Sequence, residues 1–496
     1  MSEQETFTAG TLAAEHRRVG AAVTKLVADY VRSLDRAPVC SNATPAELLA
    51  LFEGPLPEEG ADVEELLHAL HRDVVAHAMN LSSPRYFGLF NPAPMPVAVW
   101  VDALCSALNQ NGAAWRQSPS VSALEACVVR WLCGLVSYRE SGFGTLTSGG
   151  SEANLIALKC ARDAAAARAA AHGLTGTGAP LRVYASEQCH FSLVKGVDIV
   201  GVGRSNLRKI DTDTRFRIRV DSLRAAIEQD RAAGYQPCCV VGVAGATSTG
   251  AIDPLDLIAH TAEEYGLWYH VDAAYGGALA FSPSHRSLLR GIERADSVTL
   301  DPHKWMFVPF SCGALLARDG GRVLRDAFDI TPEYLDERGD ESVGDDGALD
   351  FFRYGQLGTR RANALKLWAA LRYLGRRGYR QIIERQLSLT RYLASELEKL
   401  DGFELVGDVQ TAVCCVRFVP DTLRGAAPPN QDDLQCALQQ RIERGGRAWL
   451  ATTVLHGRRV LRVNINGLLT QREHVDELVA LLRDEGPIVV AERTSP

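Results

Sequence analysis

Short apolar runs alternate with amphipathic stretches through the middle of the chain, from about residue 96 to residue 360. The runs are RVYAS at 182–186, CCVVGVAG at 238–245, WYHVDAAY at 268–275 and SVTLD at 297–301. Alternation of this kind is typical of a mainly parallel sheet whose strands are joined by crossover helices. The pattern predicts an α/β fold for this part of the chain.

The two flanking regions have different patterns. Residues 11–80 carry apolar positions at helical spacing, and four prolines between residues 84 and 96 then break the pattern. Beyond residue 360 a long helical stretch is followed by strand-like runs at 412–420 and 460–465 and by a closing helix. We expect a helical N-terminal segment (1–95), a large domain (96–360) and a small α+β domain (361–496).

Composition narrows the range of partners. The chain of 496 residues is 46% hydrophobic and 23% charged, with a net charge of -7, so it lacks the basic bias of a nucleic-acid binder. The first residues lack the apolar core of a signal peptide, and no apolar run reaches membrane-spanning length. We expect no nucleic-acid or membrane partner and a cytoplasmic location. Twelve cysteines without paired C-x-x-C spacing predict neither a zinc site nor any other metal centre.

A lysine stands in an unusual position in SVTLDPHKWMFVPF, residues 297–310. Lys304 follows a short apolar strand and precedes an aromatic, apolar stretch, although lysine is seldom buried without a partner. One interpretation is a surface turn whose lysine reaches the solvent. The other is a functional amine, kept neutral and nucleophilic by desolvation.

Two further motifs lie at predicted strand ends, where ligands of doubly wound sheets bind. In TSGGSEAN, residues 147–154, a glycine-rich turn opens a long helix with Ser151 in its first turn. The free N–H groups of such a helix suit a phosphate, although Ser151 could instead cap its own helix. In WYHVDAAYGG, Asp272 and His270 point to the same face of a strand, so the imidazole can hydrogen-bond the carboxylate.

Together with His190 of QCHFSLVKG, these motifs match the needs of pyridoxal 5'-phosphate. Lys304 would form a Schiff base with the aldehyde, and Asp272 would keep the pyridine nitrogen protonated. Ala274 is small enough for the ring to lie flat, while His190 can stack on the opposite face.

The motifs TSGGSEAN, HFSLVKG, HVDAAYGG and DPHKW, with SPRYFGLFNP upstream and LRVNI downstream, resemble the group II pyridoxal-phosphate-dependent amino-acid decarboxylases over roughly residues 80–480. The resemblance implies fold type I, with a mainly parallel seven-stranded sheet, and an obligate homodimer whose N-terminal segment wraps over its partner. It also implies decarboxylation of an L-amino acid to an amine through an external aldimine and a quinonoid. The implied cofactor residues are Gly150, Ser151, His190, Thr247, Asp272, Ala274, Asp301, His303 and Lys304.

Two positions depart from that family. Asp301 stands where many relatives have asparagine, and a carboxylate beside a phosphate dianion is repulsive. Counting back without gaps from LGTRRANALKLW, the tyrosine that protonates the carbanion falls on Phe351, which has no hydroxyl. Such a replacement accompanies aldehyde synthesis in relatives, so oxidative deamination is the alternative function. His190, Tyr334 and Tyr354 are other candidate proton donors.

The substrate itself is less readable from the sequence. By resemblance, Phe90, Asn91 and Ala113 form the side-chain pocket, and Arg462 holds the substrate carboxylate. Arg462 could instead make a structural salt bridge. Two further alternatives are a metal hydrolase built from histidines and Asp272, although no H-E-x-x-H spacing is present, and a non-enzymatic cofactor-binding protein.

Overall fold

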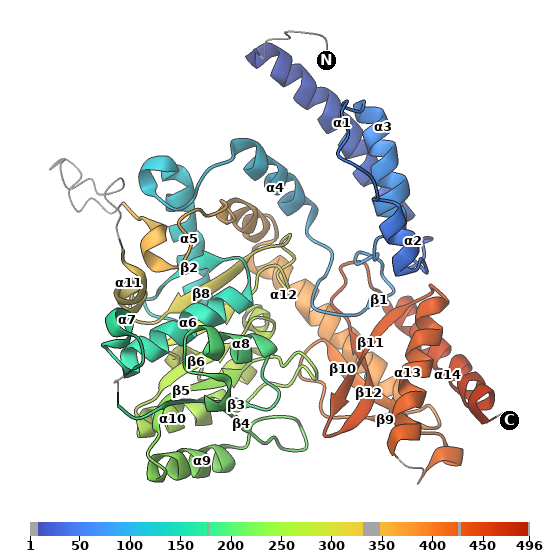
Figure 1. Ribbon diagram of the computed structural model, residues 1–496. Coiled ribbons are helices and arrows are strands. Elements are labelled where there is room, and N and C mark those ends of the chain that lie inside the picture. Colours follow the sequence, from blue (N-terminus) through green and yellow to red (C-terminus); the bar gives the residue numbers. More distant parts are fainter. Residues whose placement is uncertain (1–7, 176–177, 331–347, 425–427, 495–496) are drawn as a thin grey trace.

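The computed structural model describes residues 8–175, 178–330, 348–424 and 428–494, and it places two sheets side by side (Figure 1). The large sheet has the order β2, β8, β7, β6, β5, β3, β4. Its strands are β2 (Phe143–Thr147), β3 (Leu181–Ser186), β4 (Leu207–Ile210), β5 (Gln236–Val243), β6 (Trp268–Asp272), β7 (Ser297–Leu300) and β8 (Gly313–Ala317). Strands β3 to β7 pair in parallel, whereas β8 runs antiparallel to both of its neighbours. The predicted seven-stranded, mainly parallel sheet is confirmed.

The small sheet has the order β1, β11, β12, β10, β9. Its strands are β1 (Tyr86–Phe87), β9 (Phe403–Leu405), β10 (Val413–Phe418), β11 (Trp449–Leu455) and β12 (Arg458–Asn464). Strand β1 comes from the proline-rich connector and pairs in parallel with β11. The connector therefore joins the small sheet, and the following residues lead from it to the large domain.

The helices of the described residues are α1 (Ala9–Ser33), α2 (Pro45–Ala50), α3 (Val63–Ala69), α4 (Pro96–Leu108), α5 (Pro119–Leu135), α6 (Gly150–Ala165), α7 (Ala169–His172), α8 (Phe191–Ile199), α9 (Val220–Ala232), α10 (Leu255–Tyr265), α11 (Arg322–Phe328), α12 (Ala364–Leu397), α13 (Pro428–Arg444) and α14 (Arg472–Thr494). Some of them cover the two faces of the large sheet, whereas α13 and α14 lie beside the small sheet (Figure 1). Successive residues of β5 show the two layers, because Val240 belongs to the buried cluster that includes α5, α9 and α10, while Val241 belongs to the one that includes α6 and α8. Burial on both faces explains why the strand sequences are continuously apolar.

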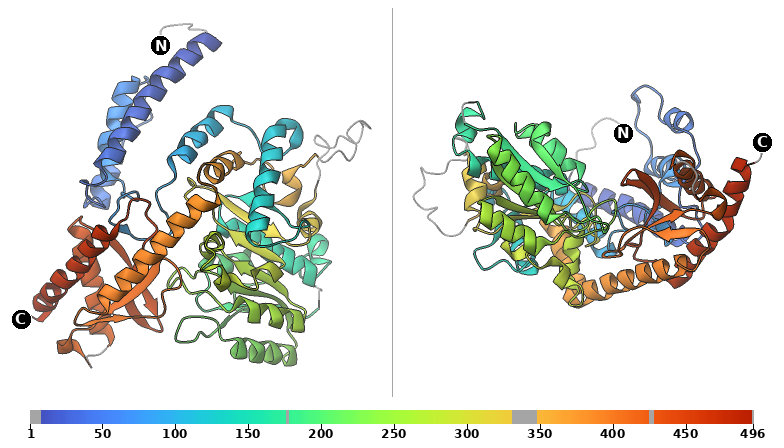
Figure 2. Two further views of the ribbon diagram at one scale, coloured as in Figure 1. Left: turned by 180° about the vertical axis from the view of Figure 1, so that it is seen from behind. Right: turned by 90° about the horizontal axis from the view of Figure 1, so that it is seen from below.

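The long helix α12 runs from the large domain to the small one (Figure 2), with a break at Gly375, whose φ of 59° is left-handed. By contrast, α1 and α3 project away from the rest of the molecule (Figure 1) and contain no buried residue. In the described part of the chain, no helix is long and apolar enough to cross a membrane.

Candidate active site

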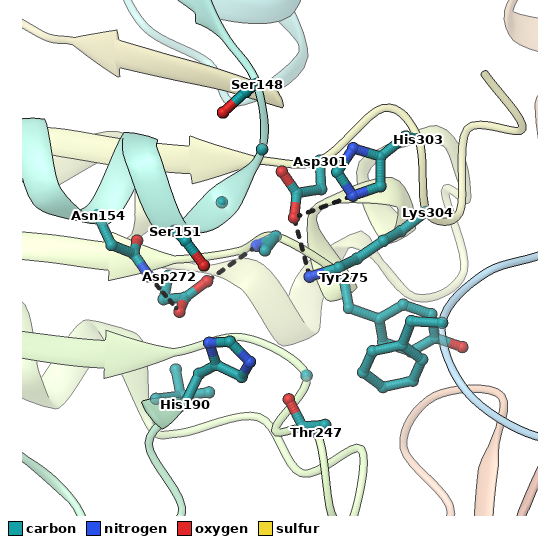
Figure 3. A pocket seen from close by; sticks show the side chains of 16 residues that line it. Ser148, Ser151, Asn154, His190, Thr247, Asp272, Tyr275, Asp301, His303 and Lys304 are labelled. Carbon is teal, nitrogen blue, oxygen red and sulfur yellow. Dashed lines mark hydrogen bonds and ion pairs between the residues drawn. The ribbon is translucent and has the colours of Figure 1, made fainter. Parts of the chain in front are cut away.

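A cavity of about 330 Å³ opens where the carboxyl ends of β6 and β7 meet the N-terminus of α6 (Figure 3). This is the expected ligand position in an open α/β sheet. The cavity brings together ten of the predicted residues: Phe90, Gly150, Ser151, His190, Thr247, Asp272, Ala274, Asp301, His303 and Lys304. Ser148, Gly149, Asn154, Val243, Gly245 and Tyr275 complete its lining.

The first turn of α6 keeps its backbone N–H groups free. The N-cap is Gly149, no side chain caps the helix, and Ser151 lies inside the first turn. The alternative in which Ser151 caps its own helix is therefore wrong. A Cβ atom on Gly150 would lie only 2.7 Å from Oδ2 of Asp301, so this position has no room for a side chain. Free N–H groups beside a glycine-lined opening form a ready anion site.

Asp272, at the end of β6, is almost fully buried, and two donors hold its carboxylate. The side-chain amide of Asn154 donates to Oδ2 at 2.9 Å, and the backbone N–H of Ala274 donates to Oδ1 at 3.2 Å. The predicted direct bond from His270 is not present. Instead, Nε2 of His270 lies 3.1 Å from Oδ1 of Asn154, so the asparagine stands between the imidazole and the carboxylate. This asparagine is not among the residues predicted from the sequence.

His270 is fully buried, and burial lowers its pKa to about 4 from the ordinary value of 6.5. Its Nδ1 lies 2.8 Å from the hydroxyl of Ser297. Between pH 6.5 and 4 the folded protein thus binds fewer protons at this ring than the unfolded chain does, so the free energy of unfolding falls as the solution is acidified.

We expect the thermal unfolding temperature to drop between pH 7.5 and pH 5.0, and His270→Gln to reduce that drop. The glutamine is neutral at every pH and loses no stability through protonation. Calorimetry at several pH values measures both slopes. Equal slopes for the parent and His270→Gln would show that this imidazole does not contribute to acid sensitivity.

His190 is the N-cap of α8, and its Nδ1 accepts a hydrogen bond from the backbone N–H of Ser192 at 3.3 Å. Its pKa is lowered, mainly by burial, against the opposing charge of Asp272. The ring is therefore favoured in its neutral form, and it lies across the cavity from α6 (Figure 3).

Lys304 is not in purely apolar surroundings, contrary to the sequence-based expectation. Its Nζ lies 2.9 Å from Oδ2 of Asp301, and this carboxylate is buried. Nε2 of His303 lies 3.7 Å from the same oxygen, and burial is the main cause that lowers the pKa of His303. The lysine is thus satisfied by a carboxylate three residues before it.

Three of the predicted substrate residues do not line the cavity. Asn91 accepts a hydrogen bond from the hydroxyl of Tyr86 at 2.8 Å, and Ala113 is buried against Phe352. Arg462 donates from Nε to the carbonyl of Thr247 and from Nη1 to that of Gly88, both at 2.8 Å. Its Nη2 is buried and makes no hydrogen bond to any described residue. The structural salt bridge considered for Arg462 is not present among the described residues.

Phe351 lies in the core and does not face the cavity. Its ring is fully buried with residues of α6 and β8, and it stacks on Phe143 with ring centroids 6.0 Å apart. Tyr354 belongs to the same cluster, 4.7 Å from the Phe143 ring. Tyr334 falls outside the described residues. Phe351 therefore does not contact the cavity in which the reaction would take place. Of the candidate proton donors, His190 is the one that lines the cavity.

The described residues contain no group of three or more histidine, cysteine, aspartate or glutamate side chains that could hold a metal ion. The metal-hydrolase alternative thus finds no ligand set there. The cavity instead has an uncapped helix N-terminus that suits an anion, a buried carboxylate and a lysine, which is the donor set that pyridoxal 5'-phosphate requires.

Comparison with known proteins agrees with this donor set. Residues 45–419 match the family model described as the pyridoxal-dependent decarboxylase conserved domain. The chain belongs to this family. It is 32% identical over 463 residues to an aromatic-L-amino-acid decarboxylase of Bacillus atrophaeus, covering 93% of each chain. It is also 29% identical to a phenylacetaldehyde synthase of a Rosa hybrid cultivar, covering 96% of this chain and 95% of that one.

Among solved structures, the Oryza sativa TDC with PLP and tryptamine superposes with a TM-score of 0.91 at 28% identity, covering 99% of this chain and 100% of that one. The protein is therefore a fold type I enzyme whose cofactor is pyridoxal 5'-phosphate and whose reaction is the decarboxylation of an amino acid.

Proposed function

We propose that the protein converts an L-amino acid into the corresponding amine, with the chemistry carried out by the residues of this cavity. The observation that carries the proposal is the meeting of Lys304, the buried Asp272 carboxylate and the uncapped α6 N-terminus around one cavity. When bound, pyridoxal 5'-phosphate supplies an aldehyde for an amine and a ring that accepts electrons from the substrate.

Each group has a distinct role in this proposal. The N–H groups at Gly150 and Ser151 bind the phosphate, with Thr247 and His303 beside the cofactor. Asp272 holds a proton on the pyridine nitrogen, and Ala274 leaves space for the ring. Lys304 carries the aldehyde in the resting enzyme. His190 covers the opposite face of the ring.

We assign Asp301 to Lys304 and not to the phosphate. Its Oδ2 is within 2.9 Å of the lysine Nζ, whereas its Oδ1 is buried and makes no hydrogen bond to any described residue. A carboxylate in this position pairs with the lysine before the aldehyde is bound. Repulsion between two anions disfavours a direct contact with the phosphate.

The substrate contact proposed for Arg462 would use Nη2, because the other two nitrogens bind the backbone carbonyls. The guanidinium also lies 4.8 Å from the ring of Phe90, which lines the cavity. Arg462 thereby links the small sheet to the side of the cavity where Phe90 and Thr247 lie.

The amine is the proposed product because Phe351, on which the oxidative alternative was based, lies in the core and does not line the cavity. We expect the parent enzyme to release carbon dioxide and amine under air, with little ammonia, peroxide or aldehyde. Phe351→Tyr should leave the product ratio unchanged, while the added buried hydroxyl costs about 1–3 kcal/mol of stability.

A panel of aromatic, aliphatic and acidic L-amino acids, with all five products quantified, tests this proposal. Abundant aldehyde from the parent that falls in the Phe351→Tyr variant would support the oxidative function instead. If the protein with bound cofactor releases no carbon dioxide from any amino acid of the panel, the proposed reaction is wrong for these substrates.

We propose that the active protein is a homodimer. Two apolar stripes with helical spacing are exposed: Leu66, Leu70 and Val74 in the N-terminal segment, and Trp100, Leu104 and Leu108 on α4. Contiguous exposed apolar surface of this kind is typical of protein interfaces. The projecting α1 and α3 (Figure 1), which contain no buried residue, would gain their packing from the partner subunit.

Replacing Trp100 and Leu104 together by glutamate should convert the dimer to monomer, because two charges would be buried in an apolar interface. Leu257→Glu is the matched control, since Leu257 is 53% exposed on α10, away from both stripes. Sedimentation velocity measures the result. A monomeric parent, or a dimer that survives the double substitution, would contradict the proposed interface.

A further inference from the structure

Asn154 is the most fully connected polar side chain at the cavity. It lies in the second turn of α6, is 1% exposed, and uses its amide in four hydrogen bonds. Its Oδ1 is 2.7 Å from Oγ1 of Thr299 and 3.1 Å from Nε2 of His270. Its Nδ2 is 2.9 Å from Oδ2 of Asp272 and 3.0 Å from Oγ of Ser192.

These partners allow only one orientation of the amide. In the reverse orientation the carbonyl oxygen would face the Asp272 carboxylate, and two acceptors would meet in a buried site. With Oδ1 toward the sheet, the hydroxyl of Thr299 and Nε2–H of His270 both donate to it. The N–H groups then point to Asp272 on one side and to Ser192 on the other.

The two bonds from Ser192 favour one tautomer of His190. Oγ of Ser192 accepts from Asn154 and lies 2.8 Å from Nδ1 of His190, a geometry in which the serine hydroxyl can donate to that nitrogen. The backbone N–H of Ser192 also donates to the same nitrogen. Two donors on Nδ1 leave the ring proton on Nε2.

We propose that Asn154 is a positioning residue that couples the two sides of the cavity: it orients the Asp272 carboxylate and, through Ser192, fixes His190 as the Nε2–H tautomer. His190 therefore presents an N–H donor, and not a lone pair, to a ligand in the cavity. This inference rests on the roles proposed above for Asp272 and His190. The neutral form that burial favours for His190 agrees with it.

The coupling has a chemical consequence for each side. A donor at Nε2 can bind an anionic oxygen of the substrate, but this nitrogen cannot act as a base. The carboxylate is held toward the cavity by an amide N–H and the Ala274 N–H (Figure 3). Losing Asn154 should thus affect cofactor binding and the His190 tautomer together.

Two variants separate the hydrogen bonds of this network. Ser192→Ala removes the side-chain bond to His190 and leaves the bond from Asn154 to Asp272. Asn154→Leu removes the bonds from Asn154 to both Ser192 and Asp272. We expect the cofactor dissociation constant to stay within about threefold in Ser192→Ala and to rise about ten- to a hundredfold in Asn154→Leu, the usual effect of losing a bond to a charged group. Equilibrium dialysis, followed by cofactor absorbance, measures both constants.

The tautomer is read from nitrogen-15 spectra of the full-length holoenzyme labelled at histidine, with His190 assigned by its absence in His190→Gln. We expect an unprotonated Nδ1 in the parent and a larger fraction of the Nδ1–H tautomer in both network variants, where the longer bond from the backbone N–H of Ser192 is left as the donor to that nitrogen. Should Asn154→Leu not fold, Asn154→Ala removes the same four hydrogen bonds with a smaller side chain, and the same two effects are expected.

Three results would overturn the proposal. They are a protonated Nδ1 in the parent, an unchanged tautomer in Ser192→Ala, and unchanged cofactor affinity in a folded Asn154 variant. None of these measurements depends on turnover, so a failure of the proposed amine-forming reaction would be distinguishable from a failure of this inference.

Discussion

Lys304→Ala is expected to lower decarboxylation by at least about a thousandfold and to release the cofactor during dialysis. The substitution removes the amine that holds the aldehyde, and with it a covalent step that no other cavity-lining lysine can replace. Steady-state carbon dioxide release and cofactor absorbance measure the two effects. Lys195→Ala is the matched control, because Lys195 is exposed on α8 near the cavity and outside its lining.

The variant protein also tests the ion pair with Asp301. In Lys304→Ala the buried carboxylate loses its partner at 2.9 Å, so a loss of thermal stability is expected in addition to the loss of activity. Activity within tenfold of the parent would contradict the assignment of Lys304, whatever the stability of the variant.

Asp272→Asn is expected to retain the cofactor and to lose activity by about a thousandfold. The amide has the same shape and keeps an oxygen that can accept from Asn154, although its NH2 group replaces the oxygen that accepts from the Ala274 N–H. A neutral group cannot hold a proton on the pyridine nitrogen, and losses of this size follow the removal of a charge-stabilising interaction. Turnover per bound cofactor is the measurement. Near-normal turnover would show that another residue holds the ring nitrogen.

The strands that carry the site could be predicted because they are buried on both faces. Continuous apolar runs ending in Asp272 and in the DPHK turn identified β6 and β7, and the glycine-rich turn identified the start of α6. Residues at the ends of parallel strands converge whatever their separation in sequence. This geometry brought Ser151, Asp272 and Lys304 to one cavity, as expected.

Asn154 could not be assigned a role without tertiary structure, because its four partners come from three other elements. A sequence signal was nevertheless present. Asparagine is a poor former of helix interiors, and here it stands on the buried face of an alanine-rich helix. A polar residue in that position needs buried partners, which β6, β7 and α8 provide.

The prediction that Phe351 takes the position of the catalytic tyrosine does not agree with the structure, for a different reason. Counting without gaps assumes a constant loop length, whereas loops are the segments in which insertions are tolerated. The prediction of purely apolar surroundings for Lys304 failed because a neighbour at i−3 folds back within the same turn. The two-residue strand β1 and its pairing with β11 are too short to be read from periodicity.

The central claim, a pyridoxal-phosphate enzyme with its cofactor on Lys304, is tested most directly by borohydride reduction of the purified protein followed by peptide mapping. Reduction converts the imine between lysine and cofactor to a stable secondary amine. The account predicts one pyridoxyl group per chain, on the peptide that contains Lys304. A pyridoxyl group on Lys195, on Lys366 or on any other lysine, or no labelled peptide from protein that contains the cofactor, would contradict it.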